Sequence, residues 1–267
     1  MNDPVTHRKS LTLPVGVNGE NEIETLPLPS YTLITGYGGG NRSGLLYRLV
    51  FYGVTQHTPD ELNFWLYSPD AMYTFYDFKR YDIPHIVRMF TEESQEETER
   101  FVVSLNEEIQ RRFQLLLQTN RHSFQEYYEE TGAELAPQMM VIIDFADCFH
   151  RHLYECKENI RYMMGEILLL AQALDVSIML CYKDHRVDWG YGMYPYYFSK
   201  RIAMQQDNFS AERTLEYKFQ TDDPWRPYGT FGINWPHCHP VKPPKVAWSD
   251  WEDELKKYFE RKKSDRE

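Results

Sequence analysis

The hydrophobic residues of this chain form short continuous runs that alternate with stretches of helical periodicity. Such runs are typical of strands buried on both faces of a sheet. They cover 31–34, 62–67, 139–143 and 176–181. Because strands that alternate with helices form parallel sheets through right-handed crossovers, the pattern predicts an α/β fold with a mostly parallel central sheet flanked by helices.

Three longer segments carry apolar residues at the spacing of one helix face, and we expect helices over 43–52, 91–116 and 155–174. Thr91 is the expected N-cap of the second helix, because a run of glutamates follows it where the helix dipole favours negative charge. The polar segment 119–134 is either a further helix or one arm of a helical hairpin.

Shorter elements surround this framework. Two apolar stretches joined by Asn18-Gly19 indicate a β-hairpin over 13–26. Segment 83–87 is a short strand or a turn. Segments 199–204 and 211–217 indicate a late strand and a short helix.

We expect three parts along the chain: a flexible N-terminal segment over 1–12, a folded domain over 13–247, and a charged helix or tail over 248–267. Within the domain, 188–197 is rich in aromatic residues and glycine, which indicates a loop or lid. This loop is either a peptide-binding surface or packed on the domain itself. Segment 225–244 is rich in Trp and Pro and is expected to wrap over the domain.

The composition restricts the possible functions. The 267 residues are 42% apolar and 15% aromatic, as in a folded globular protein. The net charge of −11 makes DNA an unexpected partner, since phosphate contacts need clustered Lys and Arg. Four cysteines without a signal peptide indicate reduced thiols and a cytoplasmic location. A membrane is expected only through a larger protein, because no apolar run approaches about 18 residues.

The stretch Tyr31–Ser43 carries the strongest chemical signal. It reads YTLITGYGGGNRS, a strand-like run followed by a glycine-rich turn and the start of a helix-like run. Backbone N–H groups at such a helix N-terminus bind phosphate. In the phosphate-loop pattern G-x-x-x-x-G-K-[ST], Gly36 and Ser43 match the first and last fixed positions. The turn also contains Gly38, Gly39 and Gly40.

The other two fixed positions of that pattern differ. Asn41 replaces the second glycine, and asparagine tolerates a left-handed backbone although its side chain can crowd a phosphate. Arg42 replaces the lysine; it keeps the positive charge but is longer, planar and forked. The segment is therefore either a modified ATP site or a glycine-rich turn without a ligand.

The strand over 139–143 ends in Asp144. In phosphate-loop folds, an aspartate here helps to hold Mg²⁺ together with the loop hydroxyl, which is Ser43 in this chain, and the next residue is a glutamate that polarises the attacking water. Phe145 stands in place of that glutamate, and Asp147 reaches the site only if the turn is rearranged. The alternative is that Asp144 caps a strand or helix.

A second group contains residue types that bind metals, namely Cys148, His150, His152 and Cys156, with His237–His239 far downstream. No pair has the C-x-x-C spacing of a zinc site, and His150 and His152 do not share a helix face. A structural metal is therefore not expected from this group.

The order of these segments resembles the motor domain of the FtsK/SpoIIIE family, which includes the EssC/EccC ATPases of type VII secretion. Leu13–Gly19 is similar to the family's opening hairpin L-P-x-G-x-(D/N)-G, and Pro29–Gly36 to its strand into the phosphate loop. Further similar segments, in order, are Ile83–Ile86, Asn106–Phe113, Asp144–Asp147, Arg201–Met204 and Glu212–Leu215. The resemblance covers about residues 11–220 and implies a RecA-like P-loop NTPase fold.

The departures from that family bear on activity. Arg42 corresponds to the family's lysine, Asn41 to its second glycine and Tyr182–Asp184 to its T-Q-R sensor, while its catalytic glutamate has no counterpart. Activation of water by a general base is alone worth about 10²–10⁴-fold in rate. The resemblance therefore implies a degenerate domain with weak or no ATP hydrolysis, in which Asp144 is vestigial.

The leading hypothesis is a binding or assembly module of a secretion-type ATPase. Its expected partners are other ATPase domains or subunits of the same machine, and a secreted protein or its signal peptide. Two alternatives remain open. One is an active hexameric DNA translocase that uses Arg42 in place of lysine, and the other is a scaffold without nucleotide or peptide ligand.

Overall fold

The computed structural model describes residues 11–18, 20, 22–36, 41–69, 74–183, 197–204, 214, 215, 230–232, 241, 242 and 257. The strands are β1 (Thr12–Asn18), β2 (Ile23–Pro27), β3 (Tyr31–Thr35), β4 (Leu62–Tyr67), β5 (Ile86–Phe90), β6 (Gln138–Ile143), β7 (Val176–Tyr182), β8 (Lys200–Ala203), β9 (Thr230–Gly232) and β10 (Val241–Lys242). The helices are α1 (Asn41–Gln56), α3 (Tyr76–Arg80), α4 (Gln95–Leu117), α5 (Phe124–Thr131), α6 (Ala146–Glu155) and α7 (Glu158–Leu170), which a 3₁₀ turn, η1 (Ala171–Leu174), extends.

A seven-stranded sheet with the order β5-β4-β6-β7-β3-β8-β9 forms the centre of the fold. Every pairing from β5 to β8 is parallel, and β9 is antiparallel to β8. A smaller antiparallel sheet with the order β10-β1-β2 lies beside α1. The mostly parallel sheet and the hairpin over β1 and β2 confirm the predicted α/β class.

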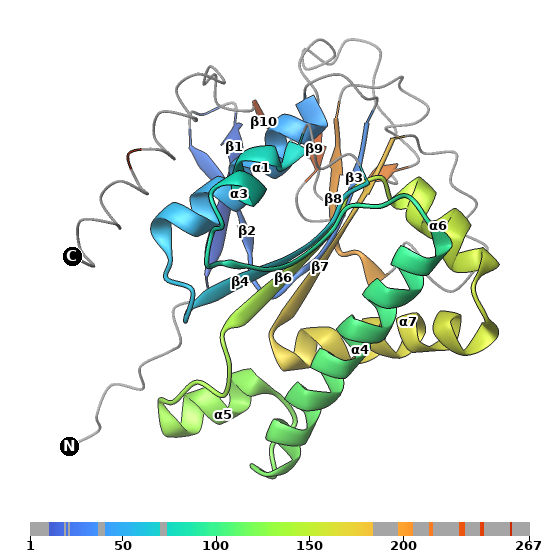
Figure 1. The fold of residues 1–267 in the computed structure, drawn as a ribbon. Helices are drawn as coiled ribbons and strands as arrows, with labels where there is room; N and C mark the ends of the chain where they lie inside the picture. Colours follow the sequence, from blue (N-terminus) through green and yellow to red (C-terminus); the bar gives the residue numbers. More distant parts are fainter. Residues whose placement is uncertain are drawn as a thin grey trace.

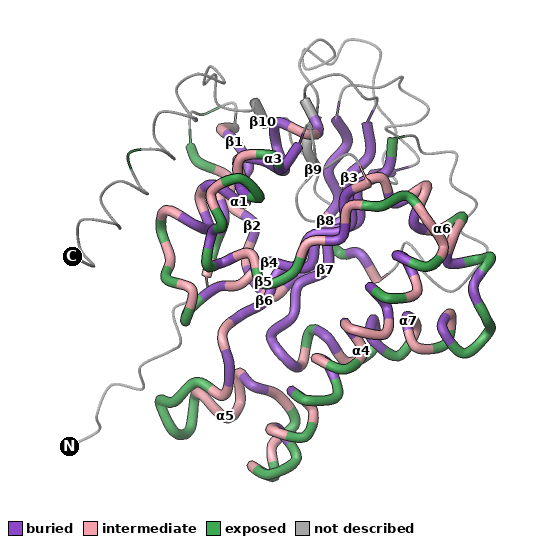
Figure 2. The backbone as a smooth tube through the Cα atoms, viewed as in Figure 1, coloured by how far each residue is buried: buried purple, intermediate pink, exposed green. Residues whose placement is uncertain are grey.

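Helices cover both faces of the large sheet (Figure 1): α4, α6 and α7 on one face, α1 and α3 on the other. Along β6, Met139, Val141 and Ile143 belong to the hydrophobic cluster under α4 and α7, whereas Met140 and Ile142 belong to the cluster under α1. The central strands are buried on both faces (Figure 2), which is why their sequences read as continuous apolar runs rather than alternating ones.

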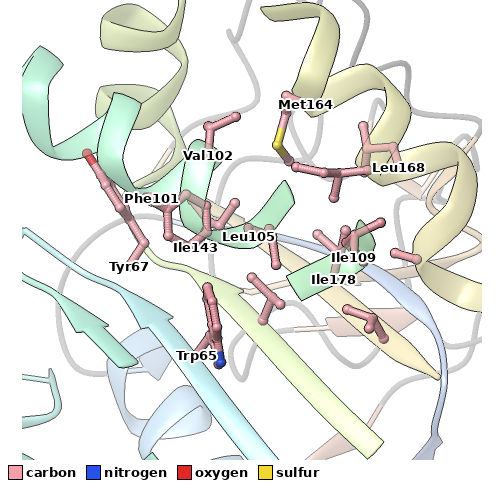
Figure 3. Packing of buried hydrophobic residues seen from close by; sticks show 14 of the residues in the cluster. Trp65, Tyr67, Phe101, Val102, Leu105, Ile109, Ile143, Met164, Leu168 and Ile178 are labelled. Atoms are coloured by element: carbon pink, nitrogen blue, oxygen red, sulfur yellow. The ribbon is translucent and has the colours of Figure 1, made fainter. Parts of the chain in front are cut away.

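The cluster under α4 joins that helix to α7 and the sheet. Figure 3 shows Phe101, Leu105 and Ile109 of α4 beside Met164 of α7 and Ile178 of β7. The spacing of the α4 residues is that of one helix face, and all of them are fully buried. This cluster covers one face of the sheet, and α1 packs against the other face.

The start of α4 differs from the prediction. Its N-cap is Ser94, whose hydroxyl accepts a hydrogen bond from the Glu97 N–H at 3.1 Å. The predicted cap, Thr91, lies outside the helix, and its N–H donates to the carboxylate of Glu97 at 3.1 Å. The glutamates after Thr91 suggested an earlier start, but the serine three residues before Glu97 has the spacing that a capping hydroxyl needs.

The predicted helix over 155–174 is confirmed from Glu158 onward, where α7 and η1 cover 158–174, and only its start is later than predicted. Helix α6 ends at Glu155, and an extended link at Cys156 and Lys157 separates it from α7. Both link residues have ψ near the extended region, 161° and 151°, so the helix cannot run through them. Helix α6 was not predicted, because it is short and mostly polar. Its buried side consists of Ala146, Phe149 and Leu153, which is too few residues for a clear helical pattern.

Two alternatives left open by the sequence are resolved. Segment 119–134 contains the helix α5, which ends at Gly132 with a left-handed φ of 69°. Segment 83–87 is a turn followed by the start of β5. Helix α1 is longer than predicted and begins at Asn41.

Several predictions fall mostly or wholly outside the described residues, namely the loop over 188–197, the wrap over 225–244 and the C-terminal helix over 248–267. Of the predicted flexible segment 1–12, the structure describes only Leu11 and Thr12, and Thr12 opens β1. Of the short helix over 211–217 it describes Thr214 and Leu215, which are helical. The predicted domain limits remain predictions.

Candidate functional site

The carboxyl ends of β3, β4 and β6 meet at one edge of the parallel sheet, where α1 begins after β3. In open α/β sheets this edge is where ligands bind. The predicted site residues Gly36, Arg42, Ser43 and Asp144 all belong to segments that end or start here. Gly38, Gly39 and Gly40 lie outside the described residues, as does the side chain of Asn41.

Gly36 has a packing role that does not depend on a ligand. A Cβ atom at this position would lie 2.4 Å from the Cβ of Met204, which is closer than real contacts allow. The reason is that the Met204 N–H donates to the Thr35 carbonyl at 2.7 Å, so that the chain after β8 passes directly beside the end of β3. The first glycine of the loop is therefore needed for the fold itself.

Arg42 and Asp144 form a buried ion pair across the end of the sheet. The Arg42 Nε lies 3.3 Å from the Asp144 Oδ1, and the two side chains are 2% and 0% exposed. Asp144 reaches α1 because side chains alternate along β6, and its even position continues the series of Met140 and Ile142 toward the α1 face. The guanidinium also lies over the ring of Phe145, 4.6 Å from its centroid.

The carboxylate of Asp144 has a full set of partners. Its Oδ1 accepts from the Phe145 N–H at 3.0 Å, and its Oδ2 accepts from the hydroxyls of Ser68 and Thr74, each at 3.3 Å. Burial raises the pKa of Asp144, and the positive charge of Arg42 opposes that shift.

Ser68 and Thr74 were missed by sequence reasoning. Ser68 directly follows the predicted strand 62–67, so the rule that parallel strands end at one edge could have placed it beside Asp144. No sequence signal marks Thr74.

Arg42 itself is incompletely partnered. Its contact with Asp144 lacks the geometry of a hydrogen bond, and its buried Nη1 has no hydrogen-bond partner among the described residues. Ser43 is half-buried and forms no side-chain hydrogen bond within the described part of the chain. A buried guanidinium nitrogen without an acceptor is costly, and it calls for an explanation.

The residues present do not fit a Mg²⁺ ion at Asp144. An ionised carboxylate offers about four acceptor positions, and here one guanidinium, one backbone N–H and two hydroxyls contact its two oxygens. The neighbouring positive charge is already supplied by Arg42. Each of the two carboxylate oxygens therefore already contacts two donors of this chain, and a metal ion at this carboxylate would have to displace one of them.

Asp147 does not replace the missing glutamate. Its carboxylate accepts a hydrogen bond from the Lys183 N–H at 2.8 Å, at the end of β7. Phe145, the N-cap residue of α6, has a left-handed φ of 54°, and this turn leads the chain from β6 into α6. The carboxylate of Asp147 is thus bound to the neighbouring strand.

The position predicted to replace the family's sensor holds a buried tyrosine–histidine contact. The Tyr182 hydroxyl lies 2.7 Å from the Nδ1 of His150 on α6. Burial lowers the pKa of His150 to about 3 and raises that of Tyr182 well above its ordinary value, so both side chains are neutral near pH 7. The contact is packed against the face of the sheet opposite to α1.

A hollow of about 650 Å³ lies between β5 and α4, away from the predicted site. Its lining is Arg88, Met89, Phe90, Glu96, Glu99, Arg100, Val103 and Ser104. No residue of the predicted phosphate site is among them.

The described residues include no group of three His, Cys, Asp or Glu side chains placed to hold a metal ion. His237–His239 lie outside them. None of the helices in the described ranges is long and apolar enough to cross a bilayer.

Known proteins are similar to this chain in sequence and in fold. The sequence model of the FtsK/SpoIIIE family matches residues 3–192. The type VII secretion system protein EssC of Staphylococcus aureus is 27% identical over 147 residues, which are 55% of this chain and 10% of EssC. The chain thus spans about a tenth of the length of this curated relative.

Two solved structures are similar over most of this chain. The cytoplasmic domain of the type VII secretion ATPase EccC from Thermomonospora curvata matches with a TM-score of 0.69 and 20% identity, over 92% of this chain and 30% of that one. EccC (ATPases 2 and 3) of the same organism, in complex with a signal sequence peptide, matches with a TM-score of 0.61 and 12% identity, over 91% and 42%. These matches confirm the RecA-like P-loop ATPase fold, and the chain belongs to the FtsK/SpoIIIE family.

Proposed function

We propose that this chain is a binding or assembly module of a type VII secretion-type ATPase, with weak or no ATP hydrolysis of its own. The observation that carries the proposal is the buried Arg42–Asp144 pair, which joins the modified lysine position of the loop to the aspartate at the end of β6. In an active site these two positions act on the phosphates and the metal, and here their side chains contact each other.

Among the described residues, neither position that the family uses to activate water holds a free base. Phe145 stands where the glutamate is expected, and Asp147 is hydrogen-bonded to the backbone at Lys183. The sensor position holds Tyr182, which contacts His150 on the face of the sheet opposite to α1. Without a base near the phosphates, the rate falls by about 10²–10⁴-fold, and a weakened electrostatic contribution lowers it further.

The similar proteins support a secretion ATPase as the complex and indicate its partners. EssC and EccC are type VII secretion proteins with several ATPase domains, and one EccC structure contains a signal sequence peptide. We therefore propose, as partners, other ATPase domains of the same machine and a signal peptide of a secreted protein. A cytoplasmic location follows from the same likeness, because the EccC match is a cytoplasmic domain. DNA is not proposed as a partner, given the net charge of −11.

The test has two parts. Phosphate release from Mg-ATP by the purified chain is expected to stay at the background rate. Turnover of about 1 s⁻¹ or faster that disappears in an Arg42→Ala variant would refute the lack of hydrolysis. Sedimentation velocity of the chain, mixed with the ATPase domains of the secretion ATPase from the same cell, is expected to show a complex, and two separate species would refute the assembly role.

A further inference from the structure

The environment of Arg42 differs from that of a residue with a purely structural role. It is buried to 2% exposure, yet it forms only one close polar contact, at 3.3 Å, and its Nη1 has no acceptor among the described residues. A guanidinium has five N–H donors, so most of this donor capacity is unused by the described side chains and backbone. The unused donors lie on the second residue of α1, a helix of 16 residues.

Two independent features at this place favour an anion. The N-terminus of a long helix presents free backbone N–H groups and a partial positive charge. The buried Nη1 adds a donor that needs an acceptor. Phosphate oxygens match both, since guanidinium groups bind phosphate with paired, charge-assisted hydrogen bonds.

The contacts of Asp144 disfavour the Mg²⁺ ion that usually accompanies a bound nucleotide phosphate. Both carboxylate oxygens are in contact with donors of this chain, and the cation beside them is Arg42. A divalent ion that binds this carboxylate would have to displace the guanidinium or one of the other donors. The positive charge beside the carboxylate thus comes from a side chain.

We propose that the α1 site takes a phosphate group free of divalent metal, and that the Arg42 guanidinium, held by Asp144, is the cation for it. This inference rests on the module proposed above and adds that its modified phosphate loop keeps a phosphate ligand that does not need the metal. The opposite behaviour is expected of a complete phosphate loop, in which Mg²⁺ bridges the nucleotide and the protein.

The test measures ATP binding to the full chain by calorimetry, once with excess Mg²⁺ and once with EDTA. We expect binding in EDTA that is at least as tight as binding with Mg²⁺. Arg42→Met, which keeps the apolar stem, is expected to weaken binding in EDTA by about tenfold, the scale of one charged hydrogen bond. Arg111→Met, which removes an exposed arginine of α4, is the matched control and is expected to leave binding unchanged.

A second variant covers the case in which Arg42→Met does not fold. Asp144→Asn keeps the size of the side chain and releases the guanidinium, so that ATP binding in EDTA is expected to tighten; Asp60→Asn, at an exposed position, is its control. Inorganic tripolyphosphate is expected to compete with ATP in EDTA.

Three results would overturn the inference: binding that Mg²⁺ strengthens tenfold or more, binding unaffected by both Arg42→Met and Asp144→Asn, and no binding of ATP at millimolar concentration to the wild type and Asp144→Asn. The sedimentation measurement of assembly requires no nucleotide. It therefore tests the secretion-module proposal independently of the phosphate-binding inference.

Discussion

Two buried arginines of this protein have opposite environments. Arg112 on α4 and Arg42 on α1 are each 2% exposed. Arg112 donates to Glu108 at 2.8 Å, to the Leu174 carbonyl at 3.1 Å and to the Pro137 carbonyl at 2.8 Å. Within the described part of the chain, Arg42 forms one ion pair, which lacks hydrogen-bond geometry.

The difference separates a structural role from a binding role. Arg112 joins α4 to the segments before β6 and β7, and each of its nitrogens has an acceptor within the chain. Arg42 keeps donor capacity that the described residues do not use. Since buried polar groups are nearly always satisfied in folded proteins, the unused donors of a buried guanidinium at the start of α1 support the proposed phosphate ligand.

The largest effect is expected at Arg112. Arg112→Met removes the donors of two backbone carbonyls and of Glu108, and it should lower the free energy of unfolding by about 3–5 kcal/mol. Urea unfolding followed by circular dichroism measures this loss. The neighbouring exposed pair provides the control, because Arg111→Met should cost about 0–1 kcal/mol. A loss at Arg112 no larger than the control would show that its contacts are not structural.

A smaller loss is expected at Arg42. Arg42→Met should cost about 2 kcal/mol, because Asp144 keeps the Phe145 N–H and two hydroxyl donors. Burial already raises the pKa of Asp144, so this carboxyl can take up a proton when the guanidinium is removed. The same urea titration compares the two arginines directly. A loss equal to that of Arg112→Met would contradict the contrast between them.

His150 is a third buried ionisable side chain, and unlike the two arginines it is buried in its neutral form. Its pKa is lowered to about 3 by burial, from an ordinary value near 6.5. Its contribution to stability is therefore complete above about pH 6.5 and is lost as the pH falls toward 3, because the unfolded chain binds the proton first. Between pH 7 and pH 5 the loss should be about 2 kcal/mol.

The measurement is the free energy of unfolding at several pH values for the wild type and His150→Gln. The glutamine variant should lack this part of the pH dependence, since it has no proton to bind. Identical slopes in the two proteins would show that His150 is accessible to protons in the folded state.

The smallest effect concerns a single cap. Ser94→Ala should destabilise the protein by about 1 kcal/mol, because the Glu97 N–H loses its acceptor. Thr91→Ala should change stability by less, since Thr91 contacts Glu97 only through its backbone. Thermal unfolding of the two variants distinguishes them. A larger loss at Thr91 would restore the cap expected from the sequence.

The sequence predicted the elements whose signal is local. The strands over 31–34, 62–67, 139–143 and 176–181 are all present, and so is the parallel sheet, because its central strands are covered by helices on both faces and need apolar residues at every position. The order of motifs predicted the family, which the comparisons confirm. The start of the helix predicted over 155–174 was three residues too early, because two extended residues, Cys156 and Lys157, precede α7.

The candidate site depended on both levels. The sequence by itself singled out Gly36, Arg42, Ser43 and Asp144 and showed which fixed positions of the phosphate loop had changed. Only the tertiary structure brought Arg42 into contact with Asp144 and surrounded that carboxylate with Ser68, at the end of β4, and Thr74, just before α3. The physical reason is that sequence patterns reflect burial and local backbone geometry. The partners of a buried charge, in contrast, depend on which strand ends the fold places next to each other.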